Sequence, residues 1–248
     1  MAAMSAAIRA RRARRIRSVL FGAAIVGVLL GINTTMLHLT SDPLADVHAY
    51  YDAGARLNAG LPLYQQAATT NDAEFYRYPP LLAILFRPLA LLPFEAAAAI
   101  WETIVVVSLG LTVVVLRPDR IRLAVFGMLF LPIMWAVTIG QAQVPVTLLV
   151  AIGSPWSIAL AAHLKIFPGV VAIWWLARRD RRALLTFGAW LIGLGVVQLI
   201  LEPAGTLAFG SVFNLGTVGE VRNLSPYAFS PVVWAALVLG GAYAAIRL

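Results

Sequence analysis

The stretch SVLFGAAIVGVLLGINTTMLHL, residues 18–39, decides the fold class of this chain. It contains no Asp, Glu, Lys or Arg over about 22 residues, and a helix of roughly 20 apolar residues crosses a bilayer. The apolar part of a secretory signal peptide is shorter, roughly 7–15 residues, and no small-x-small cleavage site follows this stretch. We therefore predict a retained membrane span, preceded by a basic cytoplasmic arm at residues 1–17.

The composition of the whole chain also indicates a membrane protein. Of 248 residues, 61% are hydrophobic and only 12% are charged, whereas soluble domains carry roughly 25% charged residues. The mean hydropathy is +0.85, and a fold in water could not hide that much apolar surface. The chain has no cysteine, which excludes a disulfide framework, a thiolate zinc site and a cysteine nucleophile. The three histidines show no metal-ligand spacing, so we expect neither a metal nor a cofactor.

Further apolar runs predict more spans. The strong candidates are Phe94–Leu116, Ile121–Ile139, Ala183–Leu201 and Ser230–Ile246. The region 144–177 is apolar but interrupted at Ser154-Pro155 and Pro168-Gly169, so it forms either one span with a re-entrant piece or a set of short half-helices. No internal repeat or low-complexity linker divides the chain. We predict an all-α polytopic membrane protein, with residues 18–248 as one domain of about six spans plus short juxtamembrane or re-entrant helices.

The basic residues predict the orientation of this domain. Most of the 19 lie in four places, namely residues 1–17, 117–122, 178–182 and Arg247. Clusters of Lys and Arg at the ends of spans are typical of the cytoplasmic side, and one topology satisfies all four. Because these charges flank apolar runs and form no basic face, the net charge of +8 predicts no nucleic-acid partner. We expect a multi-pass protein of the plasma membrane whose N-terminus is cytoplasmic.

In this topology the first outer segment, residues 40–93, concentrates polar and aromatic groups. They are Asp42, Asp46, His48, Tyr50, Tyr51, Asp52, Arg56, Tyr64, Asp72, Glu74, Tyr76, Arg77 and Tyr78. A solvated loop would explain them, but loops on rigid scaffolds also carry function. Asp46 closely follows the first span, where a carboxylate could act as a general base toward an attacking hydroxyl. The run AYYDAGARLNAG (49–60) has helical, amphipathic spacing, and Pro79-Pro80 redirects the chain toward the membrane.

Two further features favour a site for a phosphorylated group. Lys165 lies in an apolar run, where a charge near the bilayer centre costs roughly 2.5–3.5 kcal/mol on insertion scales. It either binds a partner such as a phosphate or extends to the interface from a short half-helix. The amides of GQAQ (140–143) either bond sugar hydroxyls or form a simple polar cap, which the residues alone favour. Gly27 and Gly31 form a GxxxG pair, which is typical of close helix packing.

These pieces occur in a recognisable order. DVHAYYDAGARLNAGLPLY (46–64) is followed by YRYPPLLAILFRPLALLP (76–93), IGQAQ (139–143) and HLKIFP (163–168). The combination resembles the GT87 family of polyprenyl-phosphate-mannose-dependent α-mannosyltransferases. The resemblance implies a GT-C-like helical bundle that transfers a hexose, with mannose expected. The donor would be a polyprenyl-phosphate sugar, and the acceptor a lipid or glycan on the extracytoplasmic face.

The resemblance also implies roles for individual residues. Asp46 would be the catalytic base, and the acceptor hydroxyl would displace lipid phosphate with inversion. Lys165 and Arg77 would hold the phosphate, while Tyr78 and Gln141 would line the sugar pocket. His48 would orient Asp46 or the acceptor, and Tyr51 is expected among the substrate-binding residues.

The chain departs from the family pattern in length. Family members are usually longer, and the region between GQAQ and HLKIFP is shortened here. A protein partner that completes the bundle is therefore conceivable. Two other functions stay open, namely a non-catalytic membrane subunit and a transporter for lipid-linked sugars. Broken helices beside a buried lysine fit a transporter too, although the chain shows no inverted repeat.

Overall fold

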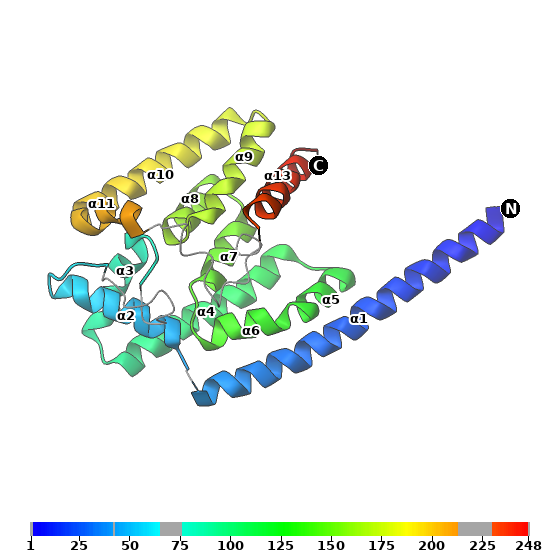
Figure 1. The fold of residues 1–248 in the computed structure, drawn as a ribbon, viewed down its shortest axis with the longest axis horizontal. Coiled ribbons are helices and arrows are strands. Elements are labelled where there is room, and N and C mark those ends of the chain that lie inside the picture. The colour runs from blue at the N-terminus through cyan, green and yellow to red at the C-terminus, as the bar shows by residue number, and fades with distance from the viewer. Residues whose placement is uncertain (1, 42, 65–75, 213–229, 248) are drawn as a thin grey trace.

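The computed structural model describes residues 2–41, 43–64, 76–212 and 230–247, and within these ranges the secondary structure is entirely helical. The loop residues Asp42, Asp72 and Glu74 fall outside the described ranges. Figure 1 shows a body of packed helices, with α1 lying along one side and extending far beyond it toward the N-terminus. The elements are α1 (Ala2–Ser41), α2 (Ala45–Asn58), α3 (Pro80–Phe86), η1 (Leu89–Leu91), α4 (Phe94–Leu116), α5 (Arg120–Met128), α6 (Phe130–Thr138), α7 (Gln143–Ile152), α8 (Pro155–Leu164), η2 (Phe167–Val170), α9 (Val171–Ala177), α10 (Arg181–Leu201), α11 (Pro203–Val212) and α13 (Pro231–Arg247).

The predicted all-α membrane fold class is confirmed, whereas the span count is not. Three described helices are long and apolar enough to cross a bilayer: Arg14–Ser41, Phe94–Leu116 and Arg181–Leu201. A fourth is possible if α5 and α6 together form one broken span. The apolar part of α13, Pro231–Gly241, is shorter than a full span. Three or four candidates thus stand where about six spans were predicted.

The predicted span at 121–139 is bent in the structure, as either a broken span or a re-entrant pair of helices. The chain bends by 59° between α5 and α6, with Leu129 at the break. Pro132 explains the bend, because proline lacks the N–H that would bond the carbonyl of Met128 and its ring clashes with that carbonyl. The helix therefore ends at Met128 and restarts at Phe130 in a new direction.

The broken region 144–177 is resolved in favour of short helices. Gly153, with φ of 67°, ends α7 in the left-handed region that favours glycine. Ser154 then caps α8, with Ser157 completing a reciprocal capping box and Pro155 in the first turn. At its other end α8 stops at Lys165, whose backbone is extended. The sequence signals here thus place a lysine at a helix end and not within a helix.

Helix α1 packs against α5 and α6 through small residues, as the GxxxG pair predicted. A methyl group added at Gly27 would stand 2.8 Å from the Cα of Met128, and one at Gly31 would stand 2.5 Å from the ring of Phe130. A methyl group added at Gly127, on the facing helix α5, would stand 2.8 Å from the Cβ of Ala24. The close approach of the two backbones therefore requires glycine at these positions.

A second core fixes the start of α2, which packs on α3 and α4. Tyr50 and Phe86 are fully buried there, and their rings meet that of Trp101 edge-on. The predicted amphipathic helix at 49–60 is thus present, but its apolar side faces other helices. This core sets the position of the residues that precede and follow it.

We predict that Gly27→Leu destabilises the protein, whereas Gly22→Leu does not. A side chain at Gly27 would overlap α5, and overpacking costs about 1–3 kcal/mol. A side chain at Gly22 meets no atom within 4 Å, and leucine favours a helix more than glycine does. Thermal unfolding of the purified variants in detergent measures the difference. Equal melting temperatures would contradict the packing of α1 on α5.

Candidate active site

The site is built around Asp46, which lies in the first turn of α2 and is half-buried. Two backbone bonds fix this turn against the end of α6. The N–H of Leu44 donates to the carbonyl of Thr138 at 3.1 Å, and the N–H of Asp46 donates to the carbonyl of Ile139 at 3.1 Å. The carboxylate is therefore held by the helix that precedes the GQAQ turn as well as by its own.

Two tyrosine hydroxyls donate to the same carboxylate oxygen of Asp46. Tyr50, one helical turn further along α2, lies 3.1 Å from Oδ2, and Tyr78 lies 3.4 Å from it. The hydroxyl of Tyr50 also accepts the N–H of Ala142 at 3.2 Å. Tyr50 thus connects the GQAQ turn to the carboxylate, and the second tyrosine brings the segment before α3 to the same atom.

Burial is the main influence on the ionisation of these groups. It raises the pKa of Asp46 above the ordinary value of 3.8. The hydrogen bond from Tyr50, the positive charge of Lys165 and the hydrogen bonds from Tyr78 and Gln141 partly oppose that rise. Burial also raises the pKa of Tyr50 and of Tyr78, so both remain protonated donors at neutral pH. A carboxylate whose pKa lies nearer neutrality is a better matched general base than an ordinary surface aspartate.

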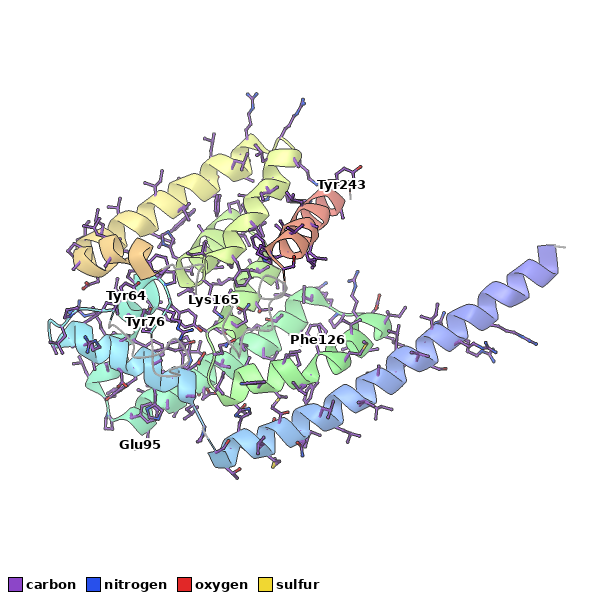
Figure 2. All side chains as sticks on the ribbon, viewed as in Figure 1. Tyr64, Tyr76, Glu95, Phe126, Lys165 and Tyr243 are labelled. Atoms are coloured by element: carbon purple, nitrogen blue, oxygen red, sulfur yellow. The ribbon has the colours of Figure 1, made fainter. Side chains whose placement is uncertain are left out.

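Lys165 lies beside this cluster, at the end of α8. Its Nζ donates to Oε1 of Gln143 at 3.2 Å and lies 5.2 Å from the centroid of the Tyr78 ring. Figure 2 places Lys165 near the centre of the helical body, on the side of α2 and α3. A half-buried ammonium and a half-buried carboxylate therefore share one site without forming a described ion pair.

Of the residues predicted for the site, four come together: Asp46, Tyr78, Gln141 and Lys165. The other three have no described contact with Asp46. The exposed ring of His48 stacks on Phe94, with centroids 3.8 Å apart, and Tyr51 donates to the carbonyl of Leu92 at 2.7 Å. Arg77 is exposed, although its charge acts on Tyr78.

Sequence reasoning missed two members of the cluster, Tyr50 and Gln143. The spacing of Tyr50 from Asp46 offered a signal, because residues four apart share a helix face. The same rule turns His48, two residues from Asp46, toward a different face. Gln143 was visible only as the second amide of GQAQ, and its contact with Lys165 spans 22 residues of chain.

A cavity of about 460 Å³ lies between α3, α8, α10 and α11. Its lining is mostly apolar and includes Pro79 and Pro80, which follow Tyr78, and also His163 and Ile166, which lie two residues before and one residue after Lys165. The cavity thus lies next to the segments that carry Tyr78 and Lys165. Across the described ranges, no three His, Asp or Glu side chains are grouped so as to hold a metal ion.

A helical membrane fold with a carboxylate and a cation beside an apolar cavity is suited to the class of integral membrane glycosyltransferases. The particular family follows from comparison, since residues 75–248 match the family model of Glycosyltransferase family 87. The chain belongs to that family, and the resemblance seen in its motifs is confirmed.

Two relatives carry the same description, polyprenol-phosphate-mannose-dependent alpha-(1-2)-phosphatidylinositol pentamannoside mannosyltransferase. The protein from Mycolicibacterium smegmatis is 25% identical over 230 residues, which cover 81% of this chain and 55% of the relative. The protein from Mycobacterium tuberculosis is 23% identical over 206 residues, which cover 73% and 47%. The chain spans about half the length of these relatives, and no solved structure matches it.

We predict that Asp46→Asn raises thermal stability at neutral pH, by an amount on the order of 2 °C. Because burial raises the pKa of Asp46, the folded state binds its proton more tightly than the unfolded state does. The ionised carboxylate thus costs stability as pH rises above the unfolded value near 3.8, and asparagine removes that cost.

Melting curves between pH 4 and pH 8 measure this effect, with Asp52→Asn, an exposed residue of the same helix, as the matched control. The advantage of the Asp46 variant should shrink toward pH 4. An advantage that is independent of pH, or a loss of stability at pH 8, would contradict the raised pKa.

Proposed function

We propose that this chain transfers a hexose, with mannose expected, from a polyprenyl-phosphate sugar to a hydroxyl of a lipid or glycan acceptor. The observation that carries the proposal is the Asp46 carboxylate, held by the hydroxyls of Tyr50 and Tyr78, with Lys165 against the ring of Tyr78. The dependence of both mycobacterial relatives on polyprenol-phosphate-mannose supports the choice of donor.

Asp46 acts as the general base in this proposal. The acceptor oxygen forms a bond to the anomeric carbon while the bond from that carbon to the phosphate oxygen breaks. The acceptor proton goes to Asp46, and the electron pair leaves with polyprenyl phosphate, which inverts the anomeric centre. The tyrosine hydroxyls, both on Oδ2, orient the carboxylate for this proton transfer.

Lys165 stabilises the leaving phosphate. Negative charge collects on the phosphate as the bond breaks, and a cation fixed in a site of low dielectric lowers the barrier most at such a place. The bond to Gln143 and the ring of Tyr78 hold the ammonium close to Asp46 before any donor binds. Arg77, exposed at the next position to Tyr78, is proposed as a second cation for the phosphate.

The apolar cavity supports a donor that is linked to lipid. It is lined by Pro79, by Ile166, the residue after Lys165, and in part by α10, one of the candidate spans. A phosphate at Lys165 would leave its hydrocarbon chain next to this cavity, whereas a nucleotide would find few polar partners there.

The position of the site along α1 supports the extracytoplasmic face. The basic arm occupies the N-terminal end of α1, and Asp46 follows its C-terminal end (Figure 1). Since the arm is expected in the cytoplasm, a helix that crosses the bilayer delivers Asp46 to the other side. The plasma membrane remains the proposed location.

We predict that sealed right-side-out vesicles carrying the chain transfer radiolabelled mannose from polyprenyl-phosphate mannose to an endogenous acceptor. Asp46→Asn should lower the rate by about 10²–10⁴-fold, the usual contribution of a general base. Asp52→Asn is the matched control, because Asp52 is exposed on the same helix and should leave transfer unchanged.

Transfer that is unaffected by Asp46→Asn would contradict the assigned base. Movement of the donor across the membrane without a labelled product would favour the transporter. An absence of both in wild-type vesicles would favour the non-catalytic subunit, and activity in inverted vesicles alone would contradict the proposed face.

We also predict that Lys165→Met lowers kcat/KM for the donor by about 10–100-fold, since a hydrogen bond to a charged group contributes roughly 1.5–3 kcal/mol. Lys165→Arg should recover part of the loss because it keeps the charge. Arg178→Met, in the cluster at 178–182, is the control and should leave the donor kinetics unchanged. Equal kinetics for Lys165→Met and wild type would remove Lys165 from the phosphate site.

A further inference from the structure

We propose that Gln198 and His163 are positioning residues that hold Tyr78 and Lys165 in register through one directed chain of hydrogen bonds. The inference rests on the proposed function and adds a mechanism by which a membrane helix controls the site. Gln198 lies in α10 with only 4% of its surface exposed. Neither Gln198 nor His163 contacts Asp46 in any described interaction.

The chain of bonds begins at the start of α3. Pro79 precedes this helix and Pro80 opens it, so the N–H of Leu81 is the first that α3 offers. Such N–H groups are usually satisfied by an N-cap side chain, but Pro79 has no side chain able to accept one. Oε1 of Gln198 accepts this N–H at 2.9 Å, across 117 residues of chain. Helix α10 therefore supplies the cap that α3 lacks.

The bonds continue from Gln198 to α8. Its Nε2 lies within hydrogen-bond distance of Nδ1 of His163, and Nε2 of His163 lies 2.9 Å from the carbonyl of Leu191. Both ends are backbone groups with only one possible role, because the N–H of Leu81 must donate and the carbonyl of Leu191 must accept. The amide of Gln198 and the ring of His163 must then each accept a hydrogen bond from the Leu81 side and donate one toward Leu191. His163 is therefore neutral, with its proton on Nε2.

This chain of hydrogen bonds joins α3 and α8, the two helices next to which Tyr78 and Lys165 lie. Tyr78 stands three residues before Leu81, and the two intervening prolines restrict the backbone between them. Lys165 stands two residues after His163, at the end of α8. The contact of Lys165 with the Tyr78 ring at 5.2 Å therefore depends on how α3 and α8 are joined, and Gln198 bonds both.

A second proton on His163 would break the chain of hydrogen bonds. Simple packing would not depend on that proton, so the dependence separates a positioning role from packing. A second proton on the ring would place an N–H on Nδ1 against the amide NH₂ of Gln198. Rotating the amide would relieve that clash but leave the N–H of Leu81 facing NH₂. Gln198→Glu reverses the requirement, because a carboxylate accepts from Leu81 and needs a proton on Nδ1.

Few other charges face His163. Within α3, α7, η2 and α10, which pack on α8, the titratable residues are Arg181 and Arg182 at the far end of α10. Lys165 follows α8 itself. Glu202, which follows α10, accepts the N–H of Gly205 at 2.9 Å. None of these four elements therefore offers His163 a carboxylate in place of Gln198.

The test compares full-length wild type with Gln198→Leu, Gln198→Glu and the control Ser108→Ala. Ser108 is a buried polar residue of α4 that takes no part in the hydrogen bonds described here. Mannosyl transfer measured from acidic to alkaline pH gives the first readout. Gln198→Leu should lower kcat by about tenfold or more. Relative to wild type at the same pH, Gln198→Glu should be most active at the acidic end and should lose activity as pH rises, while Ser108→Ala should follow wild type.

Two further readouts need no turnover, so they separate failure of this inference from failure of the proposed function. The chain has three histidines, and ¹⁵N spectra of histidine-labelled protein should show His163 neutral with its proton on Nε2. Lys165 is the one lysine in the sequence, and its rate of acylation, measured on the isolated peptide, should change in Gln198→Leu.

A proton on Nδ1 in wild type would overturn the inference. So would unchanged acylation of Lys165 in Gln198→Leu, or one shared pH profile for Gln198→Leu and Gln198→Glu. If wild type transfers no sugar but the spectra and the acylation rates behave as stated, the hydrogen-bond chain stands and the proposed reaction fails. If Gln198→Leu does not fold, Gln198→Glu and His163→Gln carry the same comparisons.

Discussion

The hydroxyl of Tyr50 is the interaction on which the rest of the site depends. It accepts the N–H of Ala142 at 3.2 Å and donates to Asp46 at 3.1 Å, so one buried oxygen joins the GQAQ turn to the carboxylate. The surrounding packing is built to hold that ring, which meets Phe86, Trp101 and Tyr78 edge-on. Because the ring is fully buried, a shift of α2, α4 or the turn would change the position of the carboxylate.

A second constraint comes from the broken backbone around the site. In a membrane protein each N–H or carbonyl freed by a helix end needs a partner within the protein. Here those partners come from distant side chains. Gln198 caps α3, the hydroxyl of Tyr76 accepts the N–H of Ala83 at 2.9 Å, and the indole N–H of Trp101 donates to the carbonyl of Gly140 at 2.7 Å. The same bonds that satisfy the backbone also bring Tyr78, Lys165 and the GQAQ turn to one place.

The sequence predicts the elements better than it predicts the contacts between them. Helix α4 begins and ends where its apolar run does, and of the two arrangements that the proline and glycine signals near Lys165 left open, the structure shows short helices. The bend at Leu129 was missed although Pro132 lies in the run, because hydropathy averaged over a span hides a single missing hydrogen bond. Gln198 was invisible for another reason, since its partners lie 117 and 35 residues away and leave no local pattern.

The central claim is that the donor phosphate binds at Lys165 with its sugar beside Asp46. The most direct measurement is a structure of the protein bound to a non-transferable phosphonate analogue of polyprenyl-phosphate mannose. The account predicts the phosphonate roughly 3 Å from Nζ of Lys165, the anomeric carbon on the side of Asp46, and the hydrocarbon chain in the cavity beside Pro79 and Ile166. A phosphonate bound away from Lys165, with no sugar atom facing Asp46, would contradict it.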